Sequence, residues 1–588
     1  MEFLKAADYI VLLMFLMCSS FIGLYQAFRG KRQTTADEYL LADRRMNPLV
    51  VIMSAIVSVT SPITYMGNPA EVYLHGPQYL AVLPSKIIPI LFITISFVPI
   101  YYKLRVTSIY EYLRIRFGEN VQYFGAAINC IFLILIMAIN VYAPAMALNA
   151  ITGLSIPGSI IAVGLVCTLY TSLGGIKAVL WTGVFQAVIS ISGILVTIIA
   201  CSVNVGGITE VFRINARDGR DTYLDFRPSP AIRHTFWSVF IGLGVMAVAY
   251  NGTNQMIVQR YMTCKSLRQA KLVAGMTVVV GGLVQVLTGV TGLFLYAYFA
   301  GCDPVTSGVI EAADQLMAYI IINLFHEIPG LTGFLMSAIF SATLGVVSSG
   351  INSLATMIGQ DIIKNVNPNI NDLKYTLVVK VVATLVGGII ISLAFVVSVL
   401  GNVLEASITI AGILNGPLLG VFMLGIYFPW SNSKGALAGM VSSVIIGIWL
   451  KTGSFFYPPV LDDPPLFVDQ CPELLTHLNQ SSRGTIYYEF ATKSNAVNTN
   501  AIDLTDDPSL YSLSYAYYTL LTTVVTVIFG LFVSFVTCPT DPSRLDPALI
   551  SPITHRICHT RGSEIKTNID VGVVGISYRR ANVDDIEL

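Results

Sequence analysis

The sequence predicts an all-α polytopic membrane protein with about thirteen transmembrane helices. Of its 588 residues, 54% are hydrophobic and only 12% are charged. Apolar runs of about 20 residues, the length that crosses a bilayer, recur along the whole chain. The formal net charge is zero, so the composition points to the lipid bilayer as the partner and gives no sign of a nucleic-acid partner.

The thirteen expected spans are distributed over most of the chain. They cover residues 8–28, 48–75, 78–102, 120–148, 156–172, 179–203, 235–259, 270–299, 330–356, 374–399, 402–427, 434–451 and 512–537. Arg29, Lys31 and Arg32 follow the first span, so it resembles a membrane helix with an external amino end more than a signal peptide. The loop Gly206–Thr235 departs from the basic-inside pattern because it holds five arginines. We therefore expect an extracellular N-terminus and a cytoplasmic C-terminus.

The second span, Pro48–Gly76, is interrupted at its centre. Pro62 stands there among hydroxyl residues, and Gly67-Asn68-Pro69 follows. Proline removes a backbone donor, and a carbonyl left unpaired inside a bilayer costs several kcal/mol unless a group binds it. One interpretation is a proline kink whose carbonyls bond neighbouring helices. The other is a broken helix that holds a substrate or an ion.

The seventh span, His234–Arg260, carries a polar run in its interior. That run is Tyr250-Asn251-Gly252-Thr253-Asn254-Gln255. Paired interrupted spans in corresponding halves of a chain indicate a transport site near the middle of the membrane. The two spans together favour a transporter over an enzyme, since the sequence shows no nucleophile with a base and no phosphate-binding glycine loop.

Four sequence runs together resemble the sodium:solute symporter family. They are Thr107–Phe117 (TSIYEYLRIRF), Tyr170–Thr182 (YTSLGGIKAVLWT), Asn254-Gln255 with Val258–Tyr261 (VQRY), and Ser349–Ala355 (SGINSLA). The resemblance covers about residues 8 to 540. A fifth run, Gly67–Tyr73 (GNPAEVY), is similar to the branch that carries monocarboxylates, biotin and pantothenate, or iodide.

The resemblance implies a leucine-transporter-like fold with a five-plus-five inverted-repeat core, in which core helices 1 and 6 are the broken spans. The implied regions are an extra N-terminal helix with its cytoplasmic loop (1–47), the first repeat (48–203), an extracellular loop (204–234), the second repeat (235–427), two further helices with a long extracellular loop at 452–511 (428–537), and a disordered cytoplasmic tail (538–588).

The same resemblance implies a secondary active transporter of the plasma membrane. The expected activity is sodium-coupled symport of a small organic anion, a monocarboxylate or a vitamin such as biotin or pantothenate, by alternating access. No cofactor is expected beyond sodium as the coupling ion. The alternatives are a sodium-independent or proton-linked carrier and a sensor that does not transport.

The family's main sodium site lies between broken helix 1 and core helix 8. The candidates here are the backbone near Val57 and Thr60, together with Ala342, Ser348 and Ser349 on helix 8. Three positions depart from the family pattern. Gly345 and Val346 stand where relatives carry two adjacent hydroxyls, and Gly183 stands where relatives commonly carry an aspartate. Ser348 and Ser349 lie about one helical turn further on, a rise of about 4.5 Å, so the sequence suggests a shifted site or altered coupling.

The candidate substrate-binding residues are Thr64, Lys86, Tyr250, Asn251, Asn254 and Glu405. Lys86 lies inside a span, where a lysine costs about 2.5–3.5 kcal/mol on insertion scales and marks a functional site by default. It could bind a substrate carboxylate, take the place of a sodium charge, pair with Glu405, or snorkel to the interface. The family resemblance implies that Thr64 favours an organic anion over iodide as the substrate.

Two expectations concern the outer loops. Cys302 and Cys471 fall in expected extracellular loops and could pair in a disulfide. Asn479-Gln480-Ser481 is an exposed glycosylation sequon, which identifies Asn479 as the expected glycosylation site.

Overall fold

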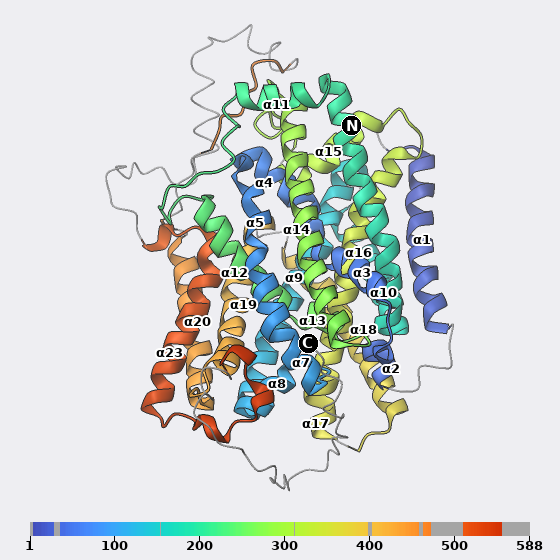
Figure 1. Cartoon of the computed structure of the whole chain (residues 1–588). Coiled ribbons are helices and arrows are strands. Elements are labelled where there is room, and N and C mark those ends of the chain that lie inside the picture. The colour runs from blue at the N-terminus through green and yellow to red at the C-terminus, as the bar shows by residue number, and fades with distance from the viewer. Residues whose placement is uncertain are drawn as a thin grey trace.

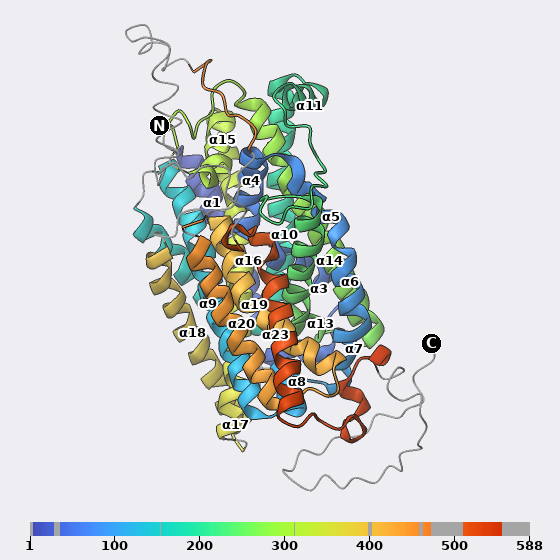
Figure 2. The same ribbon diagram turned by 90° about the vertical axis from the view of Figure 1, so that its left-hand side faces the viewer.

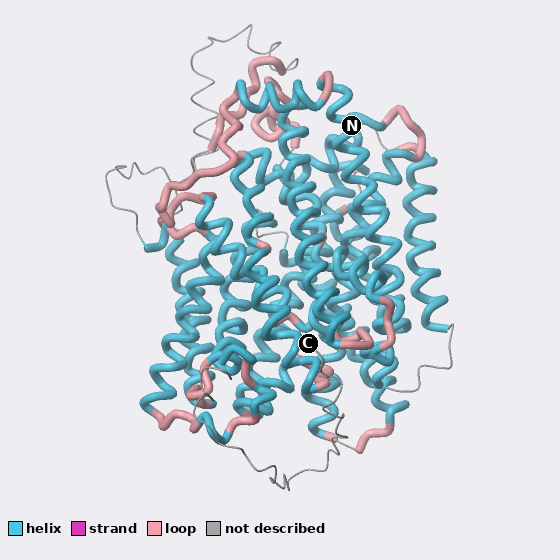
Figure 3. The backbone as a smooth tube through the Cα atoms, viewed as in Figure 1, coloured by secondary structure: helices cyan, strands magenta, loops and turns pink. Residues whose placement is uncertain are grey.

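The structure is a computed structural model that describes residues 4–28, 36–152, 155–310, 312–367, 369–397, 403–454, 456–457, 463–471 and 510–554. These residues are mainly helical, and no β-strand occurs among them; one isolated bridge joins Met46 and Cys264. Most helices run along one axis of the molecule, as Figures 1 and 3 show. The long helices are α1 (Ala6–Phe28), α9 (Glu119–Thr152), α10 (Ile156–Val205), α14 (Leu267–Tyr298), α16 (Leu331–Met357), α18 (Asp372–Val397), α19 (Val403–Tyr427), α20 (Ser433–Ser454) and α23 (Tyr518–Val536).

Shorter helices and π turns connect and cap these long helices. They are α2 (Ala36–Leu41), α3 (Pro48–Val59), η2 (Ile63–Gly67), α4 (Asn68–His75), α5 (Val82–Ser85), α6 (Ile87–Phe92), η4 (Ile93–Phe97), α7 (Val98–Leu104), α8 (Tyr110–Phe117), α11 (Ile208–Arg217), η5 (Ser238–Leu243), α12 (Gly244–Gly252), α13 (Gln255–Tyr261), α15 (Leu316–Phe325), η7 (Ile358–Ile363) and α17 (Lys364–Val366).

Each of the thirteen expected spans overlaps a helix. Within the described residues, ten helices are long and apolar enough to cross a membrane, and α3 with η2 and α4 forms one further span that bends by 61°. The shorter apolar stretches Ile156–Leu169 and Ser238–Gly252 account for the other two expected spans. The chain is a multi-span membrane protein.

Gly175 divides α10 into the two spans that the sequence predicts there. Its φ of 59° and ψ of −163° are not helical. A Cβ at this position would lie 2.7 Å from Cδ2 of Tyr39. Only glycine combines this backbone conformation with so close an approach.

The first break follows from the missing amide hydrogen of Pro62. In a continuous helix residue 62 would donate to the Ser58 carbonyl, which here accepts the Tyr250 hydroxyl at 3.2 Å. The next carbonyl, that of Val59, accepts the Thr64 hydroxyl at 3.3 Å. Side chains thus satisfy backbone groups that a bilayer could not.

The second break is stabilised in the same manner. Helix α12 ends at Gly252, and α13 begins after Asn254, whose side chain accepts from the Met256 amide. The Tyr101 hydroxyl donates to the Gly252 carbonyl at 2.9 Å, and the Tyr110 hydroxyl donates to the Thr253 carbonyl at 3.1 Å. Both interrupted spans of the sequence are therefore broken helices.

The two ends of the molecule differ in what they carry. One end, the disulfide face, holds α11 and the Cys302–Cys471 disulfide, so the expected cysteine pair is confirmed. The opposite end, the tail face, holds α8, α17 and residues Cys538–Thr554 (Figure 2). Asn479 lies outside the described residues.

The expectation of disorder from residue 538 onward is wrong as far as Thr554. The Leu549 carbonyl accepts the Tyr112 hydroxyl at 3.0 Å, and the Ser551 hydroxyl lies 2.9 Å from that of Ser96. The Ser551 amide also donates to the Ile426 carbonyl. The polar composition of the segment suggested disorder, but its backbone and hydroxyl groups form hydrogen bonds with α8, η4 and α19.

Candidate functional site

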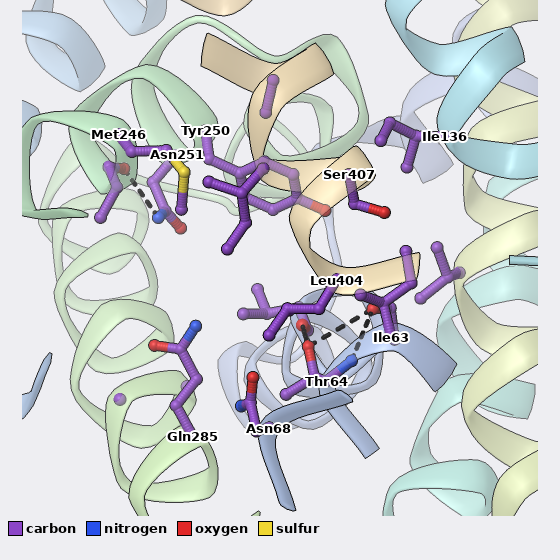
Figure 4. A pocket seen from close by; sticks show the side chains of 18 of the residues that line it. Ile63, Thr64, Asn68, Ile136, Met246, Tyr250, Asn251, Gln285, Leu404 and Ser407 are labelled. Atoms are coloured by element: carbon purple, nitrogen blue, oxygen red, sulfur yellow. Dashed lines mark hydrogen bonds between the residues drawn. The ribbon is translucent and has the colours of Figure 1, made fainter. Parts of the chain in front are cut away.

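A cavity of about 140 Å³ lies between the two broken helices. Figure 4 shows side chains from both broken helices and from α9, α14 and α19 around it. The lining residues are Val59, Ser61, Ile63, Thr64, Asn68, Tyr79, Lys86, Phe132, Ile136, Asn140, Met246, Ala247, Tyr250, Asn251, Thr277, Val278, Gly281, Gly282, Gln285, Val346, Leu404, Ser407, Ile408 and Ala411.

Among the described residues that line the cavity, Lys86 alone is charged. It connects α5 to α6, and its side chain is 9% exposed. Its stem runs along α14, where a Cβ on Gly282 would lie 2.8 Å from the Lys86 Cγ. Among the described residues, no carboxylate lies within 4.0 Å of the Lys86 ammonium. The cavity therefore carries a positive charge without a protein counter-ion.

The polar groups of the lining are partly satisfied. The Asn68 side chain donates to the Thr288 hydroxyl at 3.0 Å and accepts from the Tyr79 hydroxyl at 3.2 Å. Thr277 Oγ1, Gln285 Oε1 and Asn140 Oδ1 are buried and have no hydrogen-bond partner among the described residues. Because an unsatisfied buried polar atom costs about 1–3 kcal/mol, these atoms are ready to bond a ligand or water.

Four of the six expected substrate residues line the cavity. Thr64, Tyr250 and Asn251 do so, as Figure 4 shows, and Lys86 is the fourth. Asn254 lies at the second break, where it caps α13. The sequence thus located the cavity from the breaks and the intramembrane lysine.

The expected pairing of Lys86 with Glu405 is wrong. The Glu405 carboxylate lies 3.3 Å from Arg233 and 3.4 Å from Lys451. Charge alone suggested the pair, and the sequence gave no distance between the two helices. Glu405 is adjacent to the cavity residue Leu404 but belongs to a different cluster.

An ionic cluster, the outer network, joins Glu71, Arg233 and Glu405 next to the cavity residue Leu404. Arg233 bonds Glu71 of α4 through two contacts of 2.7 and 3.1 Å. Its third contact, with Glu405, joins α4, the outer part of broken helix 1, to α19. Burial lowers the pKa of Arg233, but the Glu71 carboxylate outweighs burial and holds that pKa above its ordinary value.

Two aromatic residues complete the outer network. The Tyr515 hydroxyl donates to Glu71 at 3.1 Å, and His234 lies 2.7 Å from the same hydroxyl. Burial lowers the pKa of His234 to about 3, against the opposing effect of the Glu71 carboxylate. His234 is therefore neutral near pH 7.

The sodium candidates lie where α3 meets α16, on the tail-face side of the cavity. No described residue donates to the Val57 carbonyl, and Thr60 Oγ1 is buried without a partner. On α16, Ala342 offers no side-chain oxygen, and the Ser348 hydroxyl bonds the Gly345 carbonyl at 3.3 Å. The Ser349 hydroxyl also bonds the Gly345 carbonyl and receives a bond from Arg260.

Close packing explains glycine at the two departing positions. A Cβ on Gly345 would lie 1.9 Å from Cγ1 of Val57, so a serine there would overlap broken helix 1. A Cβ on Gly183 would lie 2.7 Å from Oγ of Ser54. Both positions are filled by their neighbours from α3.

Sequence reasoning missed several lining residues. Asn68, Asn140, Thr277, Gln285 and Ser407 are polar positions in apolar spans. Gln285 was detectable by that signal, because a glutamine inside the span 270–299 is as unusual as the residues that were selected. The others resemble ordinary small polar residues of helix interfaces.

Comparison with known proteins identifies the family. A sequence model of the sodium:solute symporter family matches residues 39–443. The sodium-coupled monocarboxylate transporter 2 of Mus musculus is 36% identical over 561 residues, which cover 94% of this chain and 87% of that protein. The sodium-coupled monocarboxylate transporter 1 of Homo sapiens is 36% identical over 516 residues, with 87% and 84% covered. The sodium/iodide cotransporter of Homo sapiens is 33% identical over 560 residues, with 93% and 86% covered.

A solved structure has the same fold. It is a Na⁺-coupled sialic acid symporter in a substrate-bound outward-open state, and it matches with a TM-score of 0.72 and 22% identity over 92% of this chain and 99% of the other. The expected leucine-transporter-like architecture is confirmed. With a matching family model over most of its length and relatives that align nearly end to end, this chain belongs to the sodium:solute symporter family.

Proposed function

We propose that this transporter moves small organic anions, of the monocarboxylate class, across the plasma membrane by alternating access, driven by the sodium gradient. The observation that carries the proposal is the cavity between the broken helices, whose described lining residues include one ammonium group and no carboxylate. A single positive charge in a mostly apolar pocket suits a small anion with an apolar body. The names of the relatives support both the substrate class and the coupling ion.

The remaining polar groups favour an organic anion over a halide. Gln285 Oε1 and Asn140 Oδ1 can only accept hydrogen bonds, and both are buried without a partner. An anion that carries a hydroxyl donor, such as a 2-hydroxy acid, would satisfy such an acceptor, whereas iodide has no donor to offer. Vitamins such as biotin and pantothenate are larger members of the same anionic class, and the volume of about 140 Å³ favours the smaller ones.

The test is uptake of labelled lactate and pyruvate, with biotin, pantothenate and iodide alongside, in cells that express the chain. Each is measured in sodium and in choline buffer and compared with cells that lack the chain. We expect saturable uptake of lactate that requires sodium. Uptake of iodide alone would overturn the substrate class, and equal uptake in both buffers would overturn sodium coupling.

Two further proposals concern placement in the membrane. The disulfide face would be extracellular, because disulfides form in oxidising compartments, and Asn479 would be glycosylated there. Glycosidase sensitivity of the intact chain, compared with an Asn479→Gln variant, tests both points.

A further inference from the structure

The guanidinium of Arg260 lies buried between three core helices. Arg260 belongs to α13, on the tail-face side of α12 in Figure 1, and its side chain is 1% exposed. Nε donates to Ser54 Oγ of α3 at 3.4 Å, and one Nη donates to the Met256 carbonyl at 2.6 Å. The other Nη donates to Ser349 Oγ of α16. Arg260 therefore connects α3, α13 and α16 at one point.

All of these acceptors are neutral. Among the described residues, no carboxylate lies within 4.0 Å of Arg260; the outer network, by contrast, gives Arg233 two carboxylates. An unpaired buried guanidinium is costly, and a charge inside a membrane protein is a functional site by default. The junction of α3 and α16 thus already contains a positive charge.

The hydroxyl of Ser349 is already bonded by protein groups. A serine hydroxyl has one hydrogen and two lone pairs. Here the hydroxyl donates to the Gly345 carbonyl and accepts from Arg260, and the Ser58 hydroxyl, which donates to the Ser54 carbonyl, lies 3.1 Å away. The shifted sodium site that the sequence suggests at this residue is occupied by protein groups.

The preceding turn of α16 offers no replacement. Gly345 and Val346 have no side-chain oxygen, and the Val57 side chain fills the space beside Gly345. A sodium ion at this junction would also be repelled by the like charge of the guanidinium. The side chains of α16 and the charge of Arg260 therefore both disfavour an alkali cation here.

We infer that Arg260 holds the junction of α3 and α16 together in the place of a bound cation, so that no sodium ion binds between Val57 and Ser349. This inference rests on the proposed transport function. Sodium that drives uptake coordinates elsewhere in the core. Arg260 is a positioning residue: it keeps the inner half of broken helix 1 against core helix 8.

The first test measures how uptake of labelled lactate depends on sodium concentration in proteoliposomes that contain the full chain. The variants are Ser349→Ala and, as a matched control on the same helix, Ser337→Ala, whose hydroxyl bonds the Gly333 carbonyl one turn back. We expect the sodium concentration for half-maximal uptake to stay within about twofold of wild type in both variants. A tenfold rise confined to Ser349→Ala would overturn the inference.

Failure of the proposed function gives a different result. If wild-type uptake ignores sodium, the sodium half of the proposed function fails while the inference stands. If no substrate is taken up, sodium-dependent thermal stabilisation of the purified chain replaces uptake as the readout. Stabilisation that is the same in wild type and Ser349→Ala, or absent from both, supports the inference, and its selective loss in Ser349→Ala overturns it.

The second test changes the guanidinium. We expect Arg260→Gln to lower uptake at least tenfold, and Arg260→Lys to recover only part of it, because a single ammonium cannot reach acceptors on three helices. A merely structural role would leave the sodium response of the residual uptake unchanged. We expect the sodium response to change, because without the guanidinium charge a sodium ion is no longer repelled from the junction of α3 and α16. An unchanged sodium response in Arg260→Gln, whatever its uptake rate, would overturn the inference.

Discussion

Single hydroxyl groups stabilise the two broken helices. Pro62 removes the amide that would bond the Ser58 carbonyl, and Tyr250 supplies a hydroxyl in its place. Tyr101 and Tyr110 do the same for carbonyls at the second break. A residue that the sequence marks as a substrate contact therefore has a second role, which is to make the break in helix 1 stable.

Tyr250→Phe should lower the melting temperature of the purified chain. The change leaves the Ser58 carbonyl without its 3.2 Å partner, at a cost of about 1–3 kcal/mol in the free energy of unfolding. Tyr123→Phe is the matched control, because Tyr123 is 40% exposed. Equal melting temperatures for the two variants would show that the hydroxyl does not stabilise the break.

Lys86→Met should weaken substrate binding without unfolding the chain. A hydrogen bond to a charged group is worth about 1.5–3 kcal/mol, so we expect the KM for a monocarboxylate to rise roughly 10- to 100-fold. Lys380→Met is the control, since Lys380 lies in α18 outside the cavity lining. Initial rates over a range of substrate concentrations give the KM of both variants. An unchanged KM in Lys86→Met would show that the ammonium does not bind the substrate.

Gly345→Ala should destabilise the protein because its Cβ would overlap Val57. The overlap distance of 1.9 Å forces broken helix 1 or α16 to shift, at about 1–3 kcal/mol in the free energy of unfolding. Gly388→Ala is the control: nothing lies within 4 Å of its Cβ position in α18, so that change should stabilise the chain slightly. Thermal melting compares the two, and Val57→Ala in the Gly345→Ala background should recover the loss.

Among the elements, the outer network explains how the half of broken helix 1 beyond the break is held. It fixes α4 to α19 through Arg233 and places buried, neutral His234 against Tyr515. The titratable and charged groups around His234 are Glu71, His75, Tyr79, Arg233, Asp463 and Tyr515. Protonation of the histidine would add a charge inside this cluster.

Stability should therefore fall as the pH falls below about 6.5. The folded pKa of His234 is about 3, and its ordinary value is 6.5. The unfolded chain thus binds a proton first, and the stabilising contribution, complete above pH 6.5, decreases by about 1.4 kcal/mol per pH unit below it. Between pH 7.5 and about 5, the melting temperature should decrease less in His234→Gln than in the wild type. An identical decrease in both proteins would assign the effect to other groups.

The elements show which features the sequence could predict. Hydropathy located all thirteen spans, and Pro62 and the run from Tyr250 to Gln255 located both breaks, because these signals are local. Helices α11 and α15 went unpredicted, since both lie in loops between spans. The predicted pairing of Lys86 with Glu405 was wrong, because it depends on a distance between helices that no local pattern contains.

At the scale of the whole molecule, the two ends of the bundle are closed by different means. The disulfide face is joined by Cys302–Cys471, which are 169 residues apart in sequence, and by the outer network. The tail face depends on hydrogen bonds from residues after the last membrane helix to α8, α19 and η4. These residues connect elements of both expected repeats.

A chain that ends at Thr537 should be less stable than one that ends at Thr554. The shorter chain loses the Tyr112–Leu549, Ser96–Ser551 and Ile426–Ser551 bonds, which are worth about 2–4 kcal/mol together. It also loses the buried Leu549 side chain, so the surface that this side chain covers becomes exposed. The longer chain keeps every one of these bonds. Because the same segment joins α8 and η4 to α19, the shorter chain should also transport more slowly at equal surface expression. Melting temperature and uptake rate, measured on both truncations and the full chain, test this role; equal values for all three would show that the segment only rests on the tail face.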